Sequence, residues 1–394
     1  MRSIPRAVLL GQDLNAYGVA ISLHEAYGIR PLALGRYRTG ICATSKIVKT
    51  EVAPALCSEG AALSLLGTLA RRCRGMRPLL IPCTDFYLSL VVKNQDRLSE
   101  DYRIVVPDRS LYETVSEKYD FYHLLDRFGI AYPDTQIYRE GAVPSVSPPW
   151  VLKAADSASY YAQPFSGMQK VYFPDSREEA DAICRTIRSA GYRGRLLLQT
   201  RIRPERSYVL SVMADRIGGV RAASLAEVVV EERAPNARGN YCALLVRPLS
   251  DAAMRLIELC EKMHYHGIAN FDLLECGGRV YCLEMNPRQG RSSDYLRGAG
   301  HSMATFLEYT STGREYPYTR SSTPIYWHAV PHRTVMRLAE PDLACECDLR
   351  MREGFAFSPF RYDADFRFDP MRRLYVSIHE RRRTAALLAY ADRS

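Results

Sequence analysis

The sequence predicts a mixed α/β and α+β protein, in which a small doubly wound domain precedes an α+β part. Near the amino terminus, short apolar runs alternate with a stretch of helical spacing, as in the β-α-β opening over residues 7–10, 19–26 and 31–34. From residue 150 onward, apolar runs follow one another with few helices between them, a pattern typical of antiparallel sheets. A chain of 394 residues has room for two or three such domains.

The amino-terminal part reads as the doubly wound domain. A further apolar run at residues 78–82 leads into a polar loop, as expected where a parallel sheet presents its carboxyl ends to a ligand. No GxGxxG string follows the first strand, which argues against a dinucleotide-dependent dehydrogenase. In the carboxy-terminal part, alternation at residues 324–330 and 374–379 predicts a few antiparallel strands. The predicted parts are residues 1–112, 113–200, 201–314 and 315–394, of which the second and third together form one α+β domain over 113–314.

The composition indicates a folded, cytoplasmic protein. Hydrophobic residues make up 47% of the chain, which excludes a disordered protein. The apolar run near the amino terminus is too short for a secretory signal, and no stretch is long enough to span a bilayer. The 11 cysteines are scattered without CxxC pairs, so we interpret them as reduced thiols rather than as disulfides or zinc ligands.

The charge pattern leaves the class of partner open. Lys and Arg total 53 against 44 Asp and Glu, and the formal charge of +9 favours polyanionic partners. The basic residues are spread along the chain, and the cluster at 381–383 is too short for a strong nucleic-acid signal. A phosphate-rich small substrate fits the charge at least as well, so we expect no nucleic-acid partner. A nucleotide- or nucleic-acid-binding protein without enzymatic activity stays a remote alternative.

A predicted β-hairpin around Gly277-Gly278 gathers oxygen ligands on one side. Residues two apart on a strand share a face, and paired strands lie about 5 Å apart. Asp272 on the first strand therefore faces the same side as Glu284 and Asn286 on the second. Two carboxylates and an amide oxygen are the hard ligands that Mg²⁺ uses when it also holds nucleotide phosphates. Arg288, just beyond, is placed to neutralise a phosphoryl group during transfer.

The string EMNPR at residues 284–288, after a hairpin whose first strand carries Asp272, resembles the metal-binding end of the ATP-grasp superfamily. The resemblance implies an ATP-grasp fold behind a pre-ATP-grasp domain, with ATP and Mg²⁺, or Mn²⁺ in its place, as ligands. It also implies two upstream lysines on the nucleotide phosphates. Lys118, in a predicted capped helix, and Lys153, at the end of a strand, match that requirement. A solvated surface hairpin would account for single acidic residues but not for the whole string.

The segment at residues 198–202 resembles the hinge between the two ATP-binding lobes of that superfamily. The resemblance implies that Gln199 and Ile202 contact the adenine, although many relatives carry Glu where this chain has Gln199. Glu205, in the following turn, is the candidate for the ribose. The serine-containing loop at residues 154–170 either closes over the phosphates through its N–H groups or is an ordinary hairpin loop.

Most of the chain takes part in a closer resemblance. The strings LLGQDLNAYG, LLIPCTDFY, RGNYCALL, ANFDLL and above all NPRQGRSS are similar to the D-aspartate ligase group of bacterial carboxylate–amine ligases. In that group ATP activates the β-carboxylate of D-aspartate as an acyl phosphate, and the lysine amine of a peptidoglycan precursor attacks it. The resemblance implies an ADP-forming ligase. Arg291 follows the hairpin closely enough to meet the acceptor or the acid being activated, and we expect it to hold the acid. An arginine at a helix start that pairs with a surface acid is the alternative. An ATP-grasp ligase with another acid or amine stays the alternative, and the sequence leaves the oligomeric state open.

Overall fold

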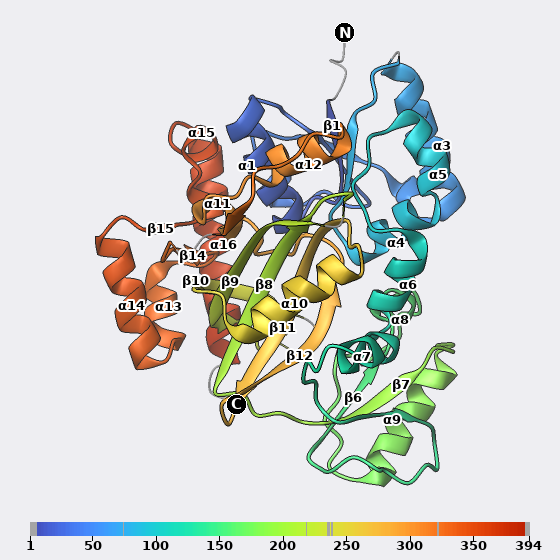
Figure 1. Ribbon diagram of the computed structural model, residues 1–394. Helices are drawn as coiled ribbons and strands as arrows, with labels where there is room; N and C mark the ends of the chain where they lie inside the picture. The colour runs from blue at the N-terminus through green and yellow to red at the C-terminus, as the bar shows by residue number, and fades with distance from the viewer. Residues whose placement is uncertain are drawn as a thin grey trace.

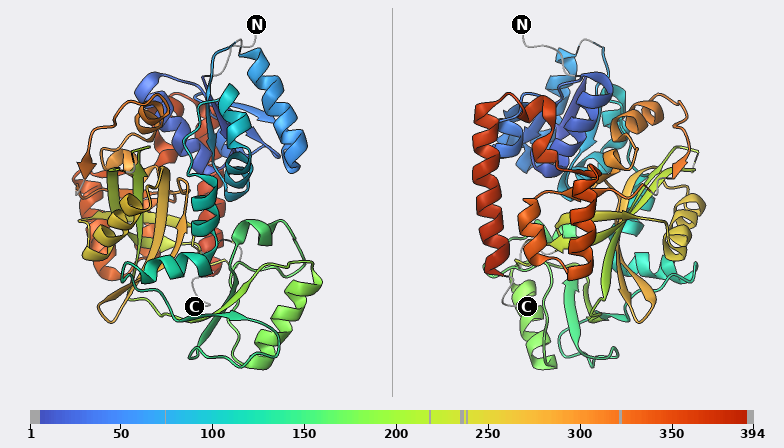
Figure 2. Two further views of the ribbon diagram at one scale, coloured as in Figure 1. Left: turned by 45° about the vertical axis from the view of Figure 1, so that its right-hand side comes forward. Right: turned by 90° about the vertical axis from the view of Figure 1, so that its left-hand side faces the viewer.

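The computed structural model describes residues 6–390 apart from 74, 218, 235–236, 238 and 321–322. Its three sheets follow one another along the molecule, with the parallel amino-terminal sheet at one end and a small antiparallel sheet at the other (Figures 1 and 2). A large, mostly antiparallel sheet lies between them. The predicted mixed α/β and α+β class is confirmed. None of the helices in the described ranges is long and apolar enough to cross a membrane.

The amino-terminal sheet is parallel, and helices cover both of its faces, as the apolar runs predict. Its strands pair in the order β3-β2-β1-β4. Ala7 and Leu9 of β1 pack with α1 on one face, whereas Val8 and Leu10 pack with α3 and α4 on the other. The elements are β1 (Ala7–Leu10), α1 (Leu14–Tyr27), β2 (Leu32–Gly35), α2 (Gly40–Ala43), β3 (Lys49–Val52), η1 (Pro54–Cys57), α3 (Glu59–Arg72), β4 (Leu79–Pro82), α4 (Asp85–Lys93) and α5 (Gln95–Asp101).

The start of α1 joins this sheet to the rest of the molecule. Asp13 caps the helix, because its carboxylate accepts the N–H of Ala16 at 3.2 Å. The side-chain amide of the buried Asn15 donates to the carbonyl oxygens of Cys83, at 2.8 Å, and Gln289, at 2.7 Å. These two bonds tie the carboxyl end of β4 to the segment that follows the last hairpin of the large sheet.

The small sheet is antiparallel, with strand order β5-β7-β6, and α9 packs on it through a compact apolar core. Helix α7 connects it to the large sheet, since Phe121 and Leu125 lie in the core of the large sheet. The loop over residues 154–170 contains the short helix α8. The elements are α6 (Arg109–Ser116), α7 (Lys118–Asp126), β5 (Thr135–Tyr138), β6 (Trp150–Ala154), α8 (Ser157–Tyr161), α9 (Arg177–Ser189) and β7 (Leu196–Thr200).

The large sheet has the order β12-β11-β8-β9-β10-β14-β15, with β13 beside β9. Helices α7 and α10 cover one face, and α1, α11 and α12 pack on the other (Figure 1). Gly277 and Gly278, with φ of 58° and 71°, form the tight turn of the predicted hairpin. The elements are β8 (Arg206–Ala214), β9 (Val220–Glu231), β10 (Tyr241–Arg247), α10 (Asp251–Lys262), β11 (Gly267–Cys276), β12 (Arg279–Asn286), α11 (Tyr295–Gly298), α12 (Met303–Ser311), β13 (Thr319–Arg320), β14 (Tyr326–His328) and β15 (Ala356–Phe357).

The carboxy-terminal part is mostly helical. The strand expected within residues 324–330 is present as β14, which pairs with β10. The strand expected over 374–379 is wrong, because those residues lie in the 20-residue helix α16. Asp369 caps this helix by accepting the N–H of Arg372 at 3.0 Å, and a helical stripe of buried side chains outweighs the local alternation. The elements are α13 (His332–Leu338), α14 (Pro341–Arg352), η2 (Pro359–Arg361), α15 (Asp363–Phe366) and α16 (Pro370–Ala389).

Candidate active site

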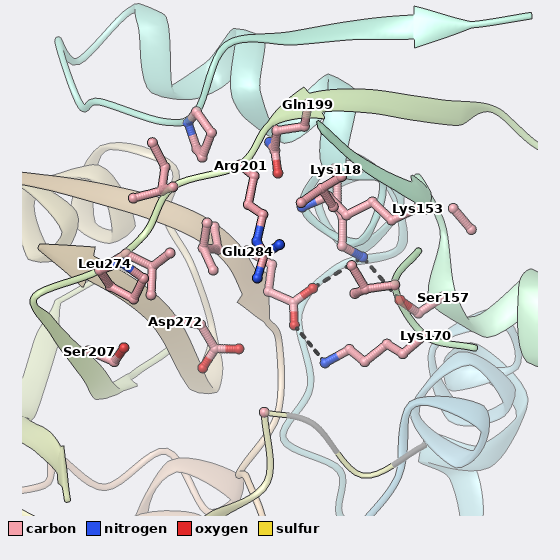
Figure 3. Close-up of a pocket in the computed structure, with 18 of the residues that line it drawn as sticks. Lys118, Lys153, Ser157, Lys170, Gln199, Arg201, Ser207, Asp272, Leu274 and Glu284 are labelled. Atoms are coloured by element: carbon pink, nitrogen blue, oxygen red, sulfur yellow. Dashed lines mark hydrogen bonds and ion pairs between the residues drawn. The ribbon is translucent and has the colours of Figure 1, made fainter. Parts of the chain in front are cut away.

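A cavity of about 280 Å³ lies between the small sheet and the β11-β12 hairpin (Figure 3). Apolar side chains such as Val151, Phe173 and Leu283 line it together with charged ones. An apolar cavity into which a few polar groups converge is the usual form of a small-molecule site. Six of the predicted site residues line this cavity: Lys118, Lys153, Gln199, Ile202, Asp272 and Glu284.

Two carboxylates face each other on the hairpin. Asp272 of β11 lies directly opposite Glu284 of β12. One oxygen of Asp272 accepts the hydroxyl of Tyr241 at 2.8 Å, and the other accepts the side-chain amide of Asn286 at 3.4 Å. Burial, together with the charge of Glu284, raises the pKa of Asp272 to about 7. The alternation of the two strands thus brings all three predicted oxygen donors together.

Two lysines hold the carboxylate of Glu284. The Nζ of Lys118 lies 3.2 Å from one oxygen, and the Nζ of Lys170 lies 3.5 Å from the other. Lys118 also donates to the hydroxyl of Ser157, at 3.0 Å, at the start of α8. Burial alone would raise the pKa of Glu284, but the two lysines lower it well below its usual range. Glu284 is therefore ionised at neutral pH, whereas the raised pKa of Asp272 lets this carboxyl gain or lose a proton near that pH.

Lys153 is, like Lys118, a buried cation of the cavity. It is only 8% exposed, and its Nζ donates to the hydroxyl of Tyr122 at 3.2 Å. Loss of solvent lowers the pKa of Lys153 to about 8. The amide of Gln199 donates to the same hydroxyl, at 3.2 Å, and to Thr135 Oγ1, at 2.7 Å. The Gln199 side chain is thereby fixed between α7 and β5.

The oxygen donors suit a hard divalent cation that also binds a phosphorylated ligand. Asp272, Glu284 and Asn286 supply carboxylate and amide oxygens from neighbouring positions. Within the described ranges, no group of three or more His, Cys, Asp or Glu side chains is placed to hold a metal ion by itself. Partial coordination by a few protein oxygens is how Mg²⁺ binds when phosphates complete its shell.

Comparisons with known proteins agree with this geometry. No protein-family model matches the chain. A D-aspartate ligase from Enterococcus faecium (strain Aus0004) is 30% identical over 353 residues, which cover 84% of this chain and 84% of that protein. The chain belongs to the ATP-grasp carboxylate–amine ligases. The superfamily resemblance of the EMNPR string is confirmed, and the protein is an ADP-forming ligase that makes C–N bonds.

Solved structures with the same fold include other members of the superfamily. The N5-carboxyaminoimidazole ribonucleotide synthetase from Thermus thermophilus matches with a TM-score of 0.60 and 18% identity over 83% of each chain. The L-amino acid ligase from Bacillus licheniformis gives a TM-score of 0.57 and 14% identity over 79% of this chain and 75% of that one. The biotin carboxylase domain of Hydrogenobacter thermophilus 2-oxoglutarate carboxylase, crystallised with MgADP and bicarbonate, gives 0.61 and 14% over 82% and 74%.

Four predicted site residues of the ligase do not line the cavity. Asn286 lies behind it, beside Asp272. The exposed Glu205 accepts the N–H of Gly277 at 3.0 Å and borders the rim. Arg288 forms two parallel bonds to Asp85 at the start of α4, at 2.6 and 2.8 Å. This fork fixes the guanidinium of Arg288 at the carboxyl end of β4.

Arg291, the fourth of these residues, has a different environment. Its Nε atom is buried, and its guanidinium has neither a hydrogen bond nor an ion pair among the residues that the structure describes. Burial and the nearby charge of Arg383 lower the pKa of Arg291. The ligase thus has an arginine with a buried Nε atom that lacks a hydrogen-bond partner, a few residues beyond the β11-β12 hairpin.

Three further side chains of the site are absent from the predicted set. Lys170 pairs with Glu284, Tyr241 with Asp272, and Arg201 lies over the ring of Phe173 at 4.4 Å. Lys170 belongs to the loop over 154–170, so the resemblance to a phosphate-covering loop was a usable signal for it. Arg201 belongs to the segment at 198–202 and Tyr241 to the string RGNYCALL, so both lay within a recognised resemblance. Neither string assigns them a contact, because only the pairing of distant strands brings Tyr241 to Asp272.

Proposed function

We propose that this ligase uses ATP to activate a carboxylate of D-aspartate and joins the acyl group to the lysine amine of a cell-wall precursor in the cytoplasm. The D-aspartate ligase relative supports the choice of acid. The observation that carries the proposal is the meeting of three lysines with two carboxylates in one apolar cavity. Such a set matches the needs of a nucleotide triphosphate with its divalent cation.

The lining of the cavity supports one orientation of the nucleotide. Its adenine would occupy the apolar part, against Gln199 and Ile202, and the phosphates would reach Lys118 and Lys153. Lys170 joins these two lysines as a third phosphate contact. Glu205 is the proposed ribose contact, since its turn continues into the cavity wall at Pro204 and Ser207.

The metal position follows from the carboxylates. Asp272, Glu284 and Asn286 would hold Mg²⁺, or Mn²⁺ in its place, and the cation would offset charge on the transferring phosphoryl group. Bound phosphates would also pair with Lys118 and Lys170, which otherwise neutralise Glu284. The acidic pair and the lysines therefore exchange partners as the site fills.

The reaction needs no covalent enzyme intermediate. An oxygen of the substrate carboxylate attacks the γ-phosphorus of ATP, ADP leaves, and an acyl phosphate remains. The amine then attacks the acyl carbon, and inorganic phosphate leaves with that carboxylate oxygen. Arg288, held by Asp85, is the proposed contact to the phosphoryl group in transfer, and Arg291 is the proposed contact to the acid.

A panel of D- and L-amino acids with ATP, Mg²⁺ and hydroxylamine tests the proposal. Hydroxylamine traps an acyl phosphate as a hydroxamate, which identifies the activated acid directly. We expect D-aspartate to give the strongest hydroxamate and phosphate signals. A strong signal with a different acid alone would move the protein to another specificity within the family. Salt-dependent DNA binding without any ATP turnover would favour the remote non-enzymatic alternative.

A further inference from the structure

A second cluster of charged side chains lies between α16 and the segment after β12. It comprises Arg291, Arg383 and His379, and we call it the arginine pocket. We infer that the arginine pocket binds the carboxylate of a dicarboxylic amino acid that is not activated, so that the carboxy-terminal helix determines the choice of substrate. This inference rests on the proposed function. It assigns a role to residues outside the cavity proposed for ATP, which we call the nucleotide cavity.

Helix α16 is anchored at both ends, which fixes the position of its side chains. Near its start, the fully buried Arg372 bonds to the carbonyl oxygen of Ile41 and to Thr44 Oγ1 of the amino-terminal domain. Near its end, Leu387 packs in the core formed by β10, β14 and α13. In the right-hand view of Figure 2 the helix runs along one side of the molecule past both of these regions.

Arg383 points from this helix toward the large sheet. Its guanidinium lies 2.8 Å from the carboxylate of Glu232 and 3.5 Å from the Sγ of Cys242. The chain neighbours of these two residues, Glu231 and Tyr241, line the nucleotide cavity. Tyr241 in turn bonds to Asp272. The arginine pocket and the cavity therefore share the end of β9 and the start of β10.

The pocket holds buried nitrogen atoms that no described residue satisfies. The Nε atoms of Arg291 and Arg383 and the Nε2 atom of His379 are buried without a hydrogen-bond partner. Buried donors are paired in almost all proteins, and an exception indicates a missing ligand or a functional role. The positive charges of Arg291 and Arg383 also repel each other, and a bound anion would offset this repulsion.

The chemistry of the pocket fits a carboxylate of an amino acid. Guanidinium forks bind carboxylates through parallel N–H bonds. Asp13 lies close enough to Arg291 to interact with its charge, and it adds an acidic group of the kind that an ammonium requires. The lysines that serve the nucleotide phosphates belong to the other cavity. A dicarboxylic amino acid can therefore place one carboxylate between the arginines and extend the other toward the Asp272–Glu284 pair.

Arg383→Ala tests the inference in the full-length ligase. With aspartate we expect its KM for the acid to rise at least about tenfold, as for loss of a bond to a charged group, while its KM for ATP stays within about twofold. Its preference for aspartate over β-alanine, which lacks the α-carboxylate, should fall by a similar factor. Arg383→Lys should restore part of both effects. The exposed neighbour on the same helix provides the matched control, Arg382→Ala, which should behave as the wild type.

Arg383→Ala also leaves the carboxylate of Glu232 without its ion-pair partner, so a second variant is needed. Arg383→Met combined with Glu232→Gln removes both charges, and its thermal melting temperature reports whether the fold survives. This double variant should show the same loss of aspartate use. A folded variant of either kind with the wild-type KM and preference for aspartate would overturn the inference.

A binding experiment separates this inference from the proposed function. If the wild type forms no hydroxamate with any amino acid, the proposed ligase specificity fails. The arginine pocket is then judged by melting temperature with MgADP present. Aspartate should stabilise the wild type and Arg382→Ala but not Arg383→Ala, and β-alanine should stabilise none. Equal stabilisation of wild type and Arg383→Ala by aspartate, or stabilisation of neither, would contradict the role of the pocket.

Discussion

The nucleotide cavity and the arginine pocket differ in how their cations are held. In the cavity, Lys118 and Lys170 share Glu284, and Lys153 bonds to Tyr122. In the pocket, the buried Nε atoms of Arg291 and Arg383 have no hydrogen-bond partner among the described residues. Ion pairs and a hydrogen bond within the protein therefore pre-position the cations of the cavity, and an incoming ligand must replace them. The pocket instead gains its first full set of partners when an anion binds.

This comparison separates the expected effects of mutations. Changes in the cavity should alter ATP use, metal use and the rate of phosphoryl transfer together, because one network of charges serves all three. Changes in the pocket should alter use of the acid alone. A pocket variant that also alters ATP use would show that the two sites are not independent.

Glu284→Ala should give the largest effect. It removes a proposed metal ligand and leaves Lys118 and Lys170 without their carboxylate, so we expect turnover to fall at least about 10²-fold. Asn286→Ala should act in the same direction. Steady-state phosphate release at saturating Mg²⁺ measures the loss, and circular dichroism checks the fold. Activity within a fewfold of the parent in both variants would remove these residues from the metal site.

Lys153→Met should follow, with a loss of about 10–100-fold in kcat/KM for ATP, since a charge contact to phosphate is removed from a buried position. Lys118→Met and Lys170→Met should act similarly, whereas their KM for the acid should change little. Initial rates over a matrix of ATP and acid concentrations separate the two constants. Normal ATP kinetics in all three variants would show that the nucleotide binds elsewhere.

Arg291→Ala should raise the KM for the acid by about 10–100-fold and leave ATP binding intact, because it removes an unpaired guanidinium from the pocket. Arg288→Ala is the matched arginine variant. Arg288 is fixed by Asp85, so its removal should lower kcat with little change in the KM for the acid. The same kinetic matrix decides between these outcomes. Identical profiles for the two variants would erase the proposed division of labour.

The lowered pKa of Lys153 gives a smaller, pH-dependent effect. Burial lowers this pKa to about 8, so near pH 8 about half of the free protein carries a neutral Lys153. Bound phosphate favours the charged form and raises the pKa, so nucleotide binding should take up about half a proton at this residue. Calorimetry in buffers of different ionisation enthalpy measures the uptake. Wild type and Lys153→Met with the same proton balance would contradict this account.

Glu205→Gln should give the smallest effect. The side chain is exposed and bonds to the hairpin turn, so we expect the KM for ATP to change by less than about threefold. Competition between ATP and 2′-deoxy-ATP tests the proposed ribose contact. Loss of a wild-type preference for ATP in the variant would support it, and an unchanged preference would assign the ribose to other residues.

The sequence predicts the hairpin well because its information is local. Strand alternation and the Gly277-Gly278 turn place Asp272, Glu284 and Asn286 on one side, as the structure has them. Similar local spacing yields the doubly wound sheet, where each strand and helix follows directly from its neighbours.

Local sequence patterns do not predict the arginine pocket, for two physical reasons. The alternation over residues 374–379 favoured a strand, whereas packing against two distant domains selects a helix. The wider spacing of Arg372, Val376, His379, Arg383 and Leu387 fits a single helix face and was the signal that could have corrected it. Arg291 was found from its motif, but its lack of a partner depends on tertiary structure.

Transfer of oxygen-18 from the acid to phosphate tests directly whether the ligase forms an acyl phosphate. Aspartate labelled in its carboxylates is incubated with the ligase, ATP, Mg²⁺ and hydroxylamine, and the inorganic phosphate is analysed by mass spectrometry. An acyl phosphate intermediate requires that one carboxylate oxygen leave with phosphate, so the account predicts one labelled oxygen in each phosphate released. Phosphate that is formed in step with the hydroxamate but carries no label would contradict it.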